Sequence, residues 1–364
     1  MKTGKSLVEL AQEIERQKAS KEDFLVSTAH TQVDVVDKQV QLTVGDQHTF
    51  GVNSLAASQI SEHVGIPAKY AEKMLTEAPD LYGTNVNTWF KKYPKQRLIR
   101  TLDKRTRAFL SNGYRPLENS DLAEAVLPVL FELDLDIMSC EVTEQRLYIK
   151  AVHKSIHRDV PYGHKIGDGS HKFFDTCSPA AIISNSEVGL GQLTVDTGIF
   201  TSVCTNLATI SDRGMKRRHI GARSDLSAGE NIRQLLSDET KRVTDKAIWL
   251  QTAHVLRGAF NEVLFEQEID KLKGIAANEL PAGADVVKVV DFTAKKYGLQ
   301  EKEKSSVLQH LIKGGDLSQY GLFNAITRTA EDLEDYDRAS EFEKLGGKFI
   351  DLTRKEWDEI ALAA

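Results

Sequence analysis

The pattern of strand-forming and helix-forming residues changes at Ser224, and this change limits the available folds most strongly. From residue 30 to residue 223, short segments rich in β-branched residues are separated by Gly, Asp and Pro, which is typical of strands joined by turns. After Ser224, helix-forming residues run to the C-terminus and are separated mainly by glycines, where helices commonly end. The sequence therefore predicts an α+β fold, with a mostly antiparallel sheet and flanking helices followed by an all-helical C-terminal region.

This division predicts three segments along the chain. Residues 1–29 should form an N-terminal helical appendage, because Leu7, Leu10 and Ile14 recur at helical spacing. Residues 30–223 should form an α+β basic core domain, and residues 224–364 a helical C-terminal domain. A chain of 364 residues is long enough for about two domains with cores of their own.

Composition and short signals constrain the location of the protein. The longest apolar runs, such as residues 179–183, are far shorter than the roughly 18 to 20 residues that cross a bilayer. The basic N-terminus reaches Glu9 and Glu13 before any apolar segment of the kind that a signal peptide contains. Only three cysteines occur, without a C-x-x-C pair, which argues against a disulfide framework. We therefore predict a cytoplasmic protein without membrane contact.

Charge is unevenly distributed along the chain. The formal net charge is −6, yet residues 86–224 hold more Lys and Arg than Asp and Glu, with Trp89, Tyr93 and Phe109 among the cations. Cations displace counterions from a phosphate backbone, and aromatic rings stack on bases of any identity. A solvated surface with its aromatics in the core is the alternative interpretation. The predicted nucleic-acid-binding residues are Lys91, Lys92, Lys95, Arg97, Arg100, Lys104, Arg105, Arg107, Tyr114, Arg115, Lys216, Arg217, Arg218, His219 and Arg223.

Histidines are concentrated between residues 153 and 171 and form a second candidate site. Two of them are four residues apart, and aspartates nearby could add oxygen ligands to a metal. The neighbouring Lys and Arg residues disfavour a bound cation, and no H-E-x-x-H motif occurs. A Gly-rich surface loop over residues 161–170, with solvated or phosphate-facing histidines, is the alternative. The weak metal candidates are His153, His157, His164 and His171.

The sequence contains no motif for a nucleotide cofactor or a serine nucleophile. The glycines around Gly189 lack the spacing and the following helix of a dinucleotide-binding fingerprint, and neither G-x-x-x-x-G-K-[ST] nor G-x-S-x-G occurs. Cys204 has no charged partner in the adjacent sequence, and a reactive thiol needs one nearby in space. We therefore predict no cofactor and leave the roles of Cys204 and of residues 185–189 open.

Five short segments carry a resemblance to a known family. They are residues 107–119 (RAFLSNGYRPLEN), 183–189 (ISNSEVG), 204–206 (CTN), 218–221 (RHIG) and 321–327 (GLFNAIT). Together they resemble a phage- and plasmid-borne family catalogued mainly as a domain of unknown function, over most of residues 30–350. Leu207 departs from this family, in which glycine commonly follows Cys-Thr-Asn. The resemblance implies a mobile element in a bacterial host cell, and it implies no particular reaction.

These observations predict a DNA-binding protein of phage or plasmid recombination, comparable in role to single-strand annealing proteins. The basic residues would hold phosphates, and Tyr93, Phe109 or Tyr114 would stack on bases. The expected partners are DNA, preferably single-stranded, further copies of the chain through the helical C-terminal region, and a phage or host replication or recombination protein. Two alternatives stay open: an interaction or anti-defence factor without catalysis, and a metal-dependent nuclease or hydrolase using the histidine cluster.

Overall fold

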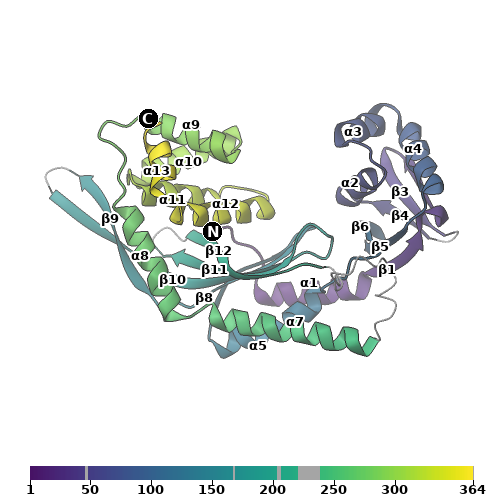
Figure 1. The fold of residues 1–364 in the computed structure, drawn as a ribbon, viewed down its shortest axis with the longest axis horizontal. Coiled ribbons are helices and arrows are strands. Elements are labelled where there is room, and N and C mark those ends of the chain that lie inside the picture. The colour runs from purple at the N-terminus through teal and green to yellow at the C-terminus, as the bar shows by residue number, and fades with distance from the viewer. Residues whose placement is uncertain (46–47, 167–168, 203–205, 220–237, 364) are drawn as a thin grey trace.

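The computed structural model describes residues 1–45, 48–166, 169–202, 206–219 and 238–363. Within these residues the chain forms two six-stranded sheets and a set of helices that ends at the C-terminus (Figure 1). The predicted α+β fold with an all-helical C-terminal region is confirmed. Residues 22–111 contain the first sheet, here called the N-terminal sheet, and residues 136–217 contain the second, here called the central sheet.

The N-terminal sheet is covered by helices on one face. Among its described strands, β4 and β6 pair in parallel and the other neighbours pair antiparallel. The apolar side chains of β2 and β3 alternate along each strand and pack with Ile60, Tyr82 and Phe90 of the helices. In spatial order the strands are β1 (Glu22–Ser27), β5 (Gln96–Leu102), β6 (Arg105–Ser111), β4 (His48–Val52), β3 (Gln39–Val44) and β2 (Thr31–Val36). The helices are η1 (Thr28–His30), α2 (Ser54–His63), α3 (Ala68–Glu77) and α4 (Pro79–Lys92).

The central sheet is antiparallel throughout its described pairs and carries a protruding ribbon. The ribbon is formed by β9 and the first part of β10, and it extends beyond the sheet (Figure 1). Residues 161–166 and 169–170 lie in these strands, so the loop expected over residues 161–170 is a β-hairpin instead. The strands are β12 (Asn206–Arg217), β11 (Leu193–Thr201), β10 (Gly169–Asn185), β8 (Leu147–Val152) and β7 (Asp136–Val142), with β9 (Arg158–Ile166) beside β10.

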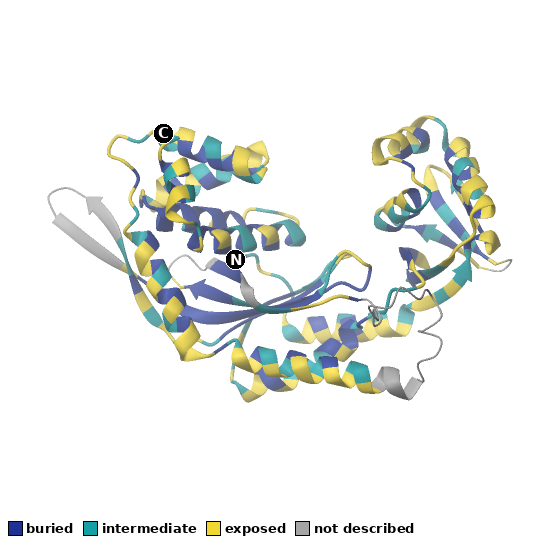
Figure 2. Cartoon of the chain, viewed as in Figure 1, coloured by how far each residue is buried: buried dark blue, intermediate teal, exposed yellow. Residues whose placement is uncertain are grey.

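Helices cover both faces of the central sheet, so β8, β11 and residues 177–185 of β10 are almost entirely buried (Figure 2). One face packs on a core that includes Leu10, Ile149 and Leu256. The helices of this face are α1 (Leu7–Ser20), α5 (Asn119–Glu132) and α7 (Asp238–Gly258). The other face packs on a separate core. The helices of this second face are α8 (Glu262–Ala276), α9 (Val286–Tyr297), α10 (Glu301–Gly314), α11 (Gln319–Thr329), α12 (Tyr336–Ile350) and α13 (Arg354–Ala361).

The segments expected from the sequence are therefore divided differently in space. Within residues 1–29, α1 packs on the central sheet and β1 forms the edge of the N-terminal sheet. Within residues 224–364, α7 belongs to one face of the central sheet and α8–α13 to the other. The central body thus contains the described residues among 1–20 and 112–363, and the N-terminal body contains the described residues among 22–111. No helix in the described part of the chain is long and apolar enough to span a membrane.

Helix α12 packs so closely on the central sheet that residue 347 has room only for glycine. A Cβ atom at Gly347 would lie 1.9 Å from the carbonyl oxygen of Thr209, whereas a Cβ at Gly274 in α8 would meet nothing within 4 Å. We expect Gly347→Ala to lower the free energy of unfolding by about 1–3 kcal/mol, as overpacking does. The control Gly274→Ala should raise it by about 0.5–1 kcal/mol. Urea unfolding measures both, and a Gly347→Ala protein as stable as the wild type would contradict this packing.

Candidate nucleic-acid interface

The residues predicted to bind nucleic acid lie in four separate parts of the structure. One group lies in the joint between the N-terminal body and the central body. A second lies at the turn between β5 and β6, a third at the end of β12, and a fourth at the C-terminal end of α4. Arg223 lies outside the described residues. The continuous basic face that the sequence suggested is therefore divided by the fold.

Arg100 lies in the joint and is 1% exposed. Its Nε donates to Oδ1 of Asp23 at 2.9 Å, and its Nη2 donates to Oε1 of Glu118 at 2.6 Å. Its Nη1 donates to the backbone carbonyl of Glu187 at 3.0 Å. Asp23 belongs to β1, Glu118 precedes α5, and Glu187 follows β10. This one guanidinium group therefore connects both sheets and the helix between them.

Glu187 receives a second set of bonds in the joint. Its Oε2 accepts from Nη2 of Arg107 at 2.7 Å, and its Oε1 accepts from the backbone N–H of Asn119 at 2.7 Å. Lys21 pairs with Glu118 and lies 3.5 Å from Glu187. Burial opposes the ionisation of Glu187, but Arg107 and the other donors outweigh it and lower its pKa. Burial and the neighbouring Glu187 carboxylate raise the pKa of Glu118.

This network corrects the expected role of two arginines. The guanidinium groups of Arg100 and Arg107 are buried and paired with carboxylates inside the protein. They are therefore not positioned to contact a phosphate backbone. Their partners Glu118 and Glu187 were not among the predicted site residues, although both lie in segments that carry the family resemblance.

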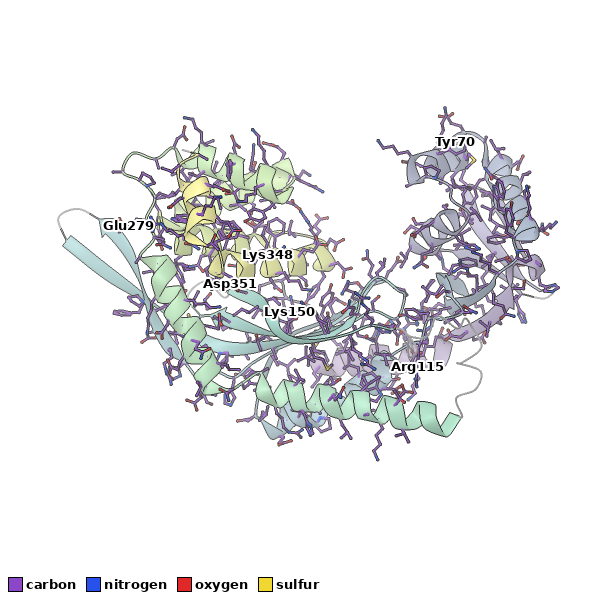
Figure 3. The ribbon with its side chains drawn as sticks, viewed as in Figure 1. Tyr70, Arg115, Lys150, Glu279, Lys348 and Asp351 are labelled. Carbon is purple, nitrogen blue, oxygen red and sulfur yellow. The ribbon has the colours of Figure 1, made fainter. Side chains whose placement is uncertain are left out.

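Tyr114, Arg115 and His219 also belong to the joint. The hydroxyl of Tyr114 donates to the carbonyl of Ser186 at 2.8 Å, and its ring stacks on that of His219 with centroids 5.3 Å apart. Nδ1 of His219 accepts from the backbone N–H of Leu117 at 3.1 Å. The guanidinium of Arg115 pairs with Asp245 of α7 at 2.6 Å, at the place labelled in Figure 3. Residues 112–119, 183–189 and 218–219, separated in the sequence, thus meet here.

The turn between β5 and β6 and the end of β12 present small groups of exposed cations. Lys104 and Arg105 are exposed at the turn, beside Asp103, whose carboxylate accepts from Arg16 at 2.8 Å. At the other location Lys216, Arg217 and Arg218 are exposed. Neither location shows an exposed aromatic ring among its described neighbours in the chain. These cations can attract phosphate, but they offer no surface for base stacking.

The C-terminal end of α4 combines exposed rings with exposed cations. We call Trp89, Lys91, Lys92, Tyr93 and Lys95 the aromatic–lysine patch. The two rings are 37% and 59% exposed, and they lie nearly parallel, with centroids 5.9 Å apart and planes at 7°. Nζ of Lys92 lies 5.3 Å and 5.6 Å from the two ring centroids, within cation–π range. Lys91 and Lys95 are exposed beside them.

The helical period of α4 produces this patch. Tyr82, Val86 and Phe90 recur every four residues and are buried against the N-terminal sheet. Trp89 and Tyr93 are likewise four residues apart, on the face that remains exposed, where residues at this spacing contact each other. The indole N–H of Trp89 donates to the side chain of Asn85 at 2.9 Å, which fixes the ring. Cations at the last turn are also favoured by the helix dipole.

Two further predicted residues next to the patch face inward. Arg97 is partly buried, contacts Nδ1 of His63, and lies 5.6 Å from the centroid of the Phe109 ring. Phe109 is 3% exposed, so it is not available to stack on a base. Of the three rings expected to stack, Tyr93 is therefore the exposed one, and Trp89 joins it.

The histidine cluster does not come together as a metal site in the described residues. His153 is partly buried with its ring 6.0 Å from that of Phe260, and His157 is exposed. The side chains of His164 and His171, like Cys204, lie outside the described residues. Elsewhere in the described structure, no three His, Cys, Asp or Glu side chains are grouped to hold a metal ion. Burial raises the pKa of the Cys140 and Cys177 thiols, which makes them weak nucleophiles.

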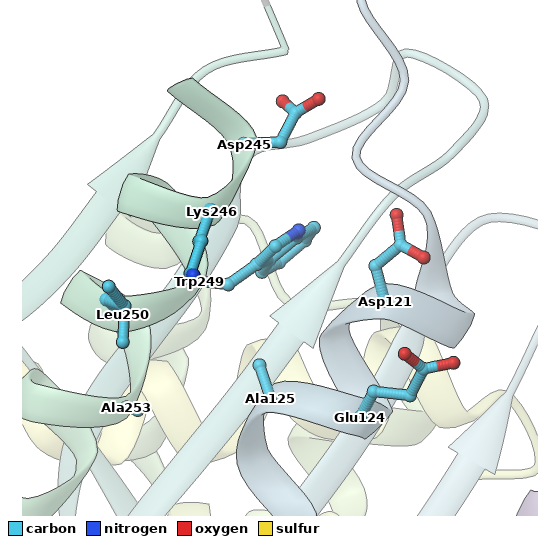
Figure 4. Close-up of a pocket in the computed structure, with 8 residues that line it drawn as sticks. All are labelled: Asp121, Glu124, Ala125, Asp245, Lys246, Trp249, Leu250 and Ala253. Atoms are coloured by element: carbon cyan, nitrogen blue, oxygen red, sulfur yellow. The ribbon is translucent and has the colours of Figure 1, made fainter. Parts of the chain in front are cut away.

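A cavity of about 520 Å³ lies between α5 and α7. Figure 4 shows Trp249 on one wall, with Asp121, Glu124 and Asp245 around it and Lys246 beside it. Burial and the neighbouring carboxylates raise the pKa of Asp121. Because three of the four charged residues in this lining are acidic, it repels a phosphate backbone, so the cavity is not part of the candidate interface.

No protein-family model, curated protein or solved structure matches the chain. The family resemblance therefore stays a prediction. The candidate interface is defined by geometry alone, as an exposed pair of rings with three lysines on the N-terminal body.

The buried histidine of the joint makes stability depend on pH. Burial, and then Arg100, lower the pKa of His219 from 6.5 to about 4. The unfolded chain therefore binds this proton first, and stability is lost as the pH falls from about 6.5 towards 4. At pH 5 the loss from this group should be about 2 kcal/mol. His219→Asn keeps an acceptor for the N–H of Leu117 and removes the titration.

Urea unfolding at pH 8, 6.5 and 5 tests this expectation. Between pH 8 and pH 5, the free energy of unfolding of the His219→Asn variant should fall by about 2 kcal/mol less than that of the wild type. His63, whose pKa burial and Arg97 also lower to about 4, contributes equally in both proteins and cancels in the comparison. Identical pH dependence in the two proteins would mean that His219 is not buried in its neutral form.

Proposed function

We propose that the protein binds single-stranded DNA through the aromatic–lysine patch and acts in phage or plasmid recombination by single-strand annealing. The observation that supports this proposal most directly is the exposed, parallel Trp89–Tyr93 pair with Lys92 over both rings. Large aromatic side chains are normally buried, and a pair left exposed among cations indicates binding. Base–aromatic stacking stabilises single-strand complexes by about 1–3 kcal/mol per base.

The charges of the patch favour a phosphate backbone as the second part of the ligand. Lys91, Lys92 and Lys95 form no ion pair with a described carboxylate. Each is exposed and free to displace a counterion from a phosphate, which makes binding weaken as salt rises. Stacking requires an accessible base face, and a duplex hides its base faces within the helix. The combination therefore favours a single strand over a duplex.

The proposal also includes partners other than DNA, and two alternative functions compete with it. Self-association through the helical region and a phage or host recombination protein as partner stay predictions. The interaction-factor alternative shares the exposed rings but requires no affinity for DNA. The nuclease alternative also stays a prediction, because the side chains of His164 and His171 lie outside the described residues.

Replacing the two rings should remove most of the affinity for single strands. We expect Trp89→Ala with Tyr93→Ala to weaken binding of an oligothymidine by at least about 30-fold, because two stacking contacts are lost. Phe131, a 67% exposed ring on α5, provides a matched control, and Phe131→Ala should bind like the wild type. Fluorescence anisotropy measures all three proteins, and circular dichroism checks that each is folded.

The lysines should control the salt dependence separately. The triple variant Lys91→Gln, Lys92→Gln, Lys95→Gln loses three phosphate contacts. Each contact with a single strand contributes about 0.7 to the slope of log K against log salt, so this slope should be flatter by about 2. A wild-type protein that binds no oligonucleotide at low salt would overturn the proposal and favour the interaction factor. Tighter binding to a duplex of equal length would overturn the single-strand preference.

A further inference from the structure

Three cations gather on the face of the central sheet that α12 covers, outside the patch. Lys216 belongs to β12, directly opposite Thr194 of β11. Lys344 belongs to α12, which packs on β12. Arg146 lies in the turn before β8, where its Nη2 donates to the carbonyl of Leu190 at 2.6 Å. These residues come from three different elements, so the sequence shows no cluster.

Two other charged side chains of this face are paired with a partner from α12 or the central sheet. Nζ of Lys150 lies 2.7 Å from Oε2 of Glu343, and both side chains are buried beneath α12, where Figure 3 labels Lys150. The hydroxyl of Tyr148 donates to Asp337 at 2.7 Å. By contrast, Arg146, Lys216 and Lys344 form no ion pair with any carboxylate in the described part of the chain.

Arg146 and Lys216 both lie close enough to Lys344 to affect its pKa. Burial is the main cause that lowers the pKa of Lys344, and Arg146 and Lys216 lower it further, against the opposing effect of Asp196. Asp196 is 1% exposed, and its own pKa is raised by burial although Lys344 and Lys216 oppose this. Glu341, the other carboxylate near Lys344, is bonded to Arg338 at 2.6 Å. Lys216 and Lys344 thus face one buried carboxylate, and Arg146 adds a third positive charge near Lys344.

The position of Arg146 depends on a glycine. A Cβ atom at Gly191 would lie 2.3 Å from Nη2 of Arg146, so the guanidinium group lies directly against the backbone at this glycine. One edge of the guanidinium is occupied by the carbonyl of Leu190. A guanidinium has five N–H donors in a planar fork, so donors remain for an anion at the other edge.

We propose that Arg146, Lys216 and Lys344 form a second phosphate-binding site for nucleic acid, on the central sheet. This inference rests on the proposed function and adds a contact on the other body of the protein. An excess of positive charge at a partly buried position costs stability unless an anion balances it. A phosphodiester supplies that anion, with oxygens that accept from both the guanidinium and the ammonium groups.

The test is the salt dependence of oligonucleotide binding by a double variant, Lys216→Gln with Lys344→Gln. We expect its slope of log K against log salt to be flatter than that of the wild type by about 1.4, since two contacts with a single strand are lost. Lys348→Gln is the matched control: Lys348 is exposed on the same helix, four residues further along (Figure 3), and its slope should equal that of the wild type.

A thermal denaturation curve without DNA adds a second readout. The double variant should still unfold in one cooperative transition, at a lower temperature than the wild type because Lys216 and Lys344 stabilise the buried Asp196 carboxylate; a folded protein at the assay temperature separates lost binding from lost folding. An unchanged salt slope in the double variant would overturn this second site. If the Trp89→Ala, Tyr93→Ala protein binds the oligonucleotide more weakly than the wild type in the same experiment, the proposed function is still supported. Absence of oligonucleotide binding by the wild type would overturn both.

Discussion

The arrangement of the two bodies depends on Glu187 and the cations around it. Its carboxylate accepts from Arg107 of the N-terminal sheet and from the backbone of Asn119, while its carbonyl accepts from Arg100. The two sheets have separate apolar cores and share a small apolar cluster around Val188. A buried ion network is a directional contact, and removing one partner from such a pair costs about 3–5 kcal/mol. The joint therefore determines where the aromatic–lysine patch lies relative to the central sheet.

The sequence predicted the fold class well because its signals are local. Strand alternation, turn residues and glycines at helix ends each act over a few residues, and the helical region after Ser224 was recognisable from them. The role of the arginines was not predictable in this way. Arg100 and Arg107 lie in the same basic stretch as Lys104, but their burial depends on Glu187, far away in the sequence. Long-range pairing of this kind leaves no periodic pattern in a single chain.

The candidate interface shows the same contrast between local and distant determinants. Lys91, Lys92 and Tyr93 were identified from the sequence because they are consecutive residues. They remain together in the structure, where they are exposed at the C-terminal end of α4. Trp89 could have been added from its spacing of four residues to Tyr93. The proximity of Arg146 and Lys344 could not have been predicted from sequence spacing. The turn before β8 and helix α12 come together only in the folded protein.

The order of the chain through the two bodies has a mechanical consequence. The first helix packs on the central sheet, the chain then builds the whole N-terminal body, and it returns to the central body before α5. The N-terminal body is thus an insertion held by two chain crossings, and Lys21 at the first crossing pairs with Glu118 near the second. A body attached twice cannot swing freely as one on a single tether does. Two attachments leave rotation about the line through the crossings, and the bonds from Arg100 and Arg107 to Glu118 and Glu187 oppose that rotation, so the N-terminal body is held at three places rather than two.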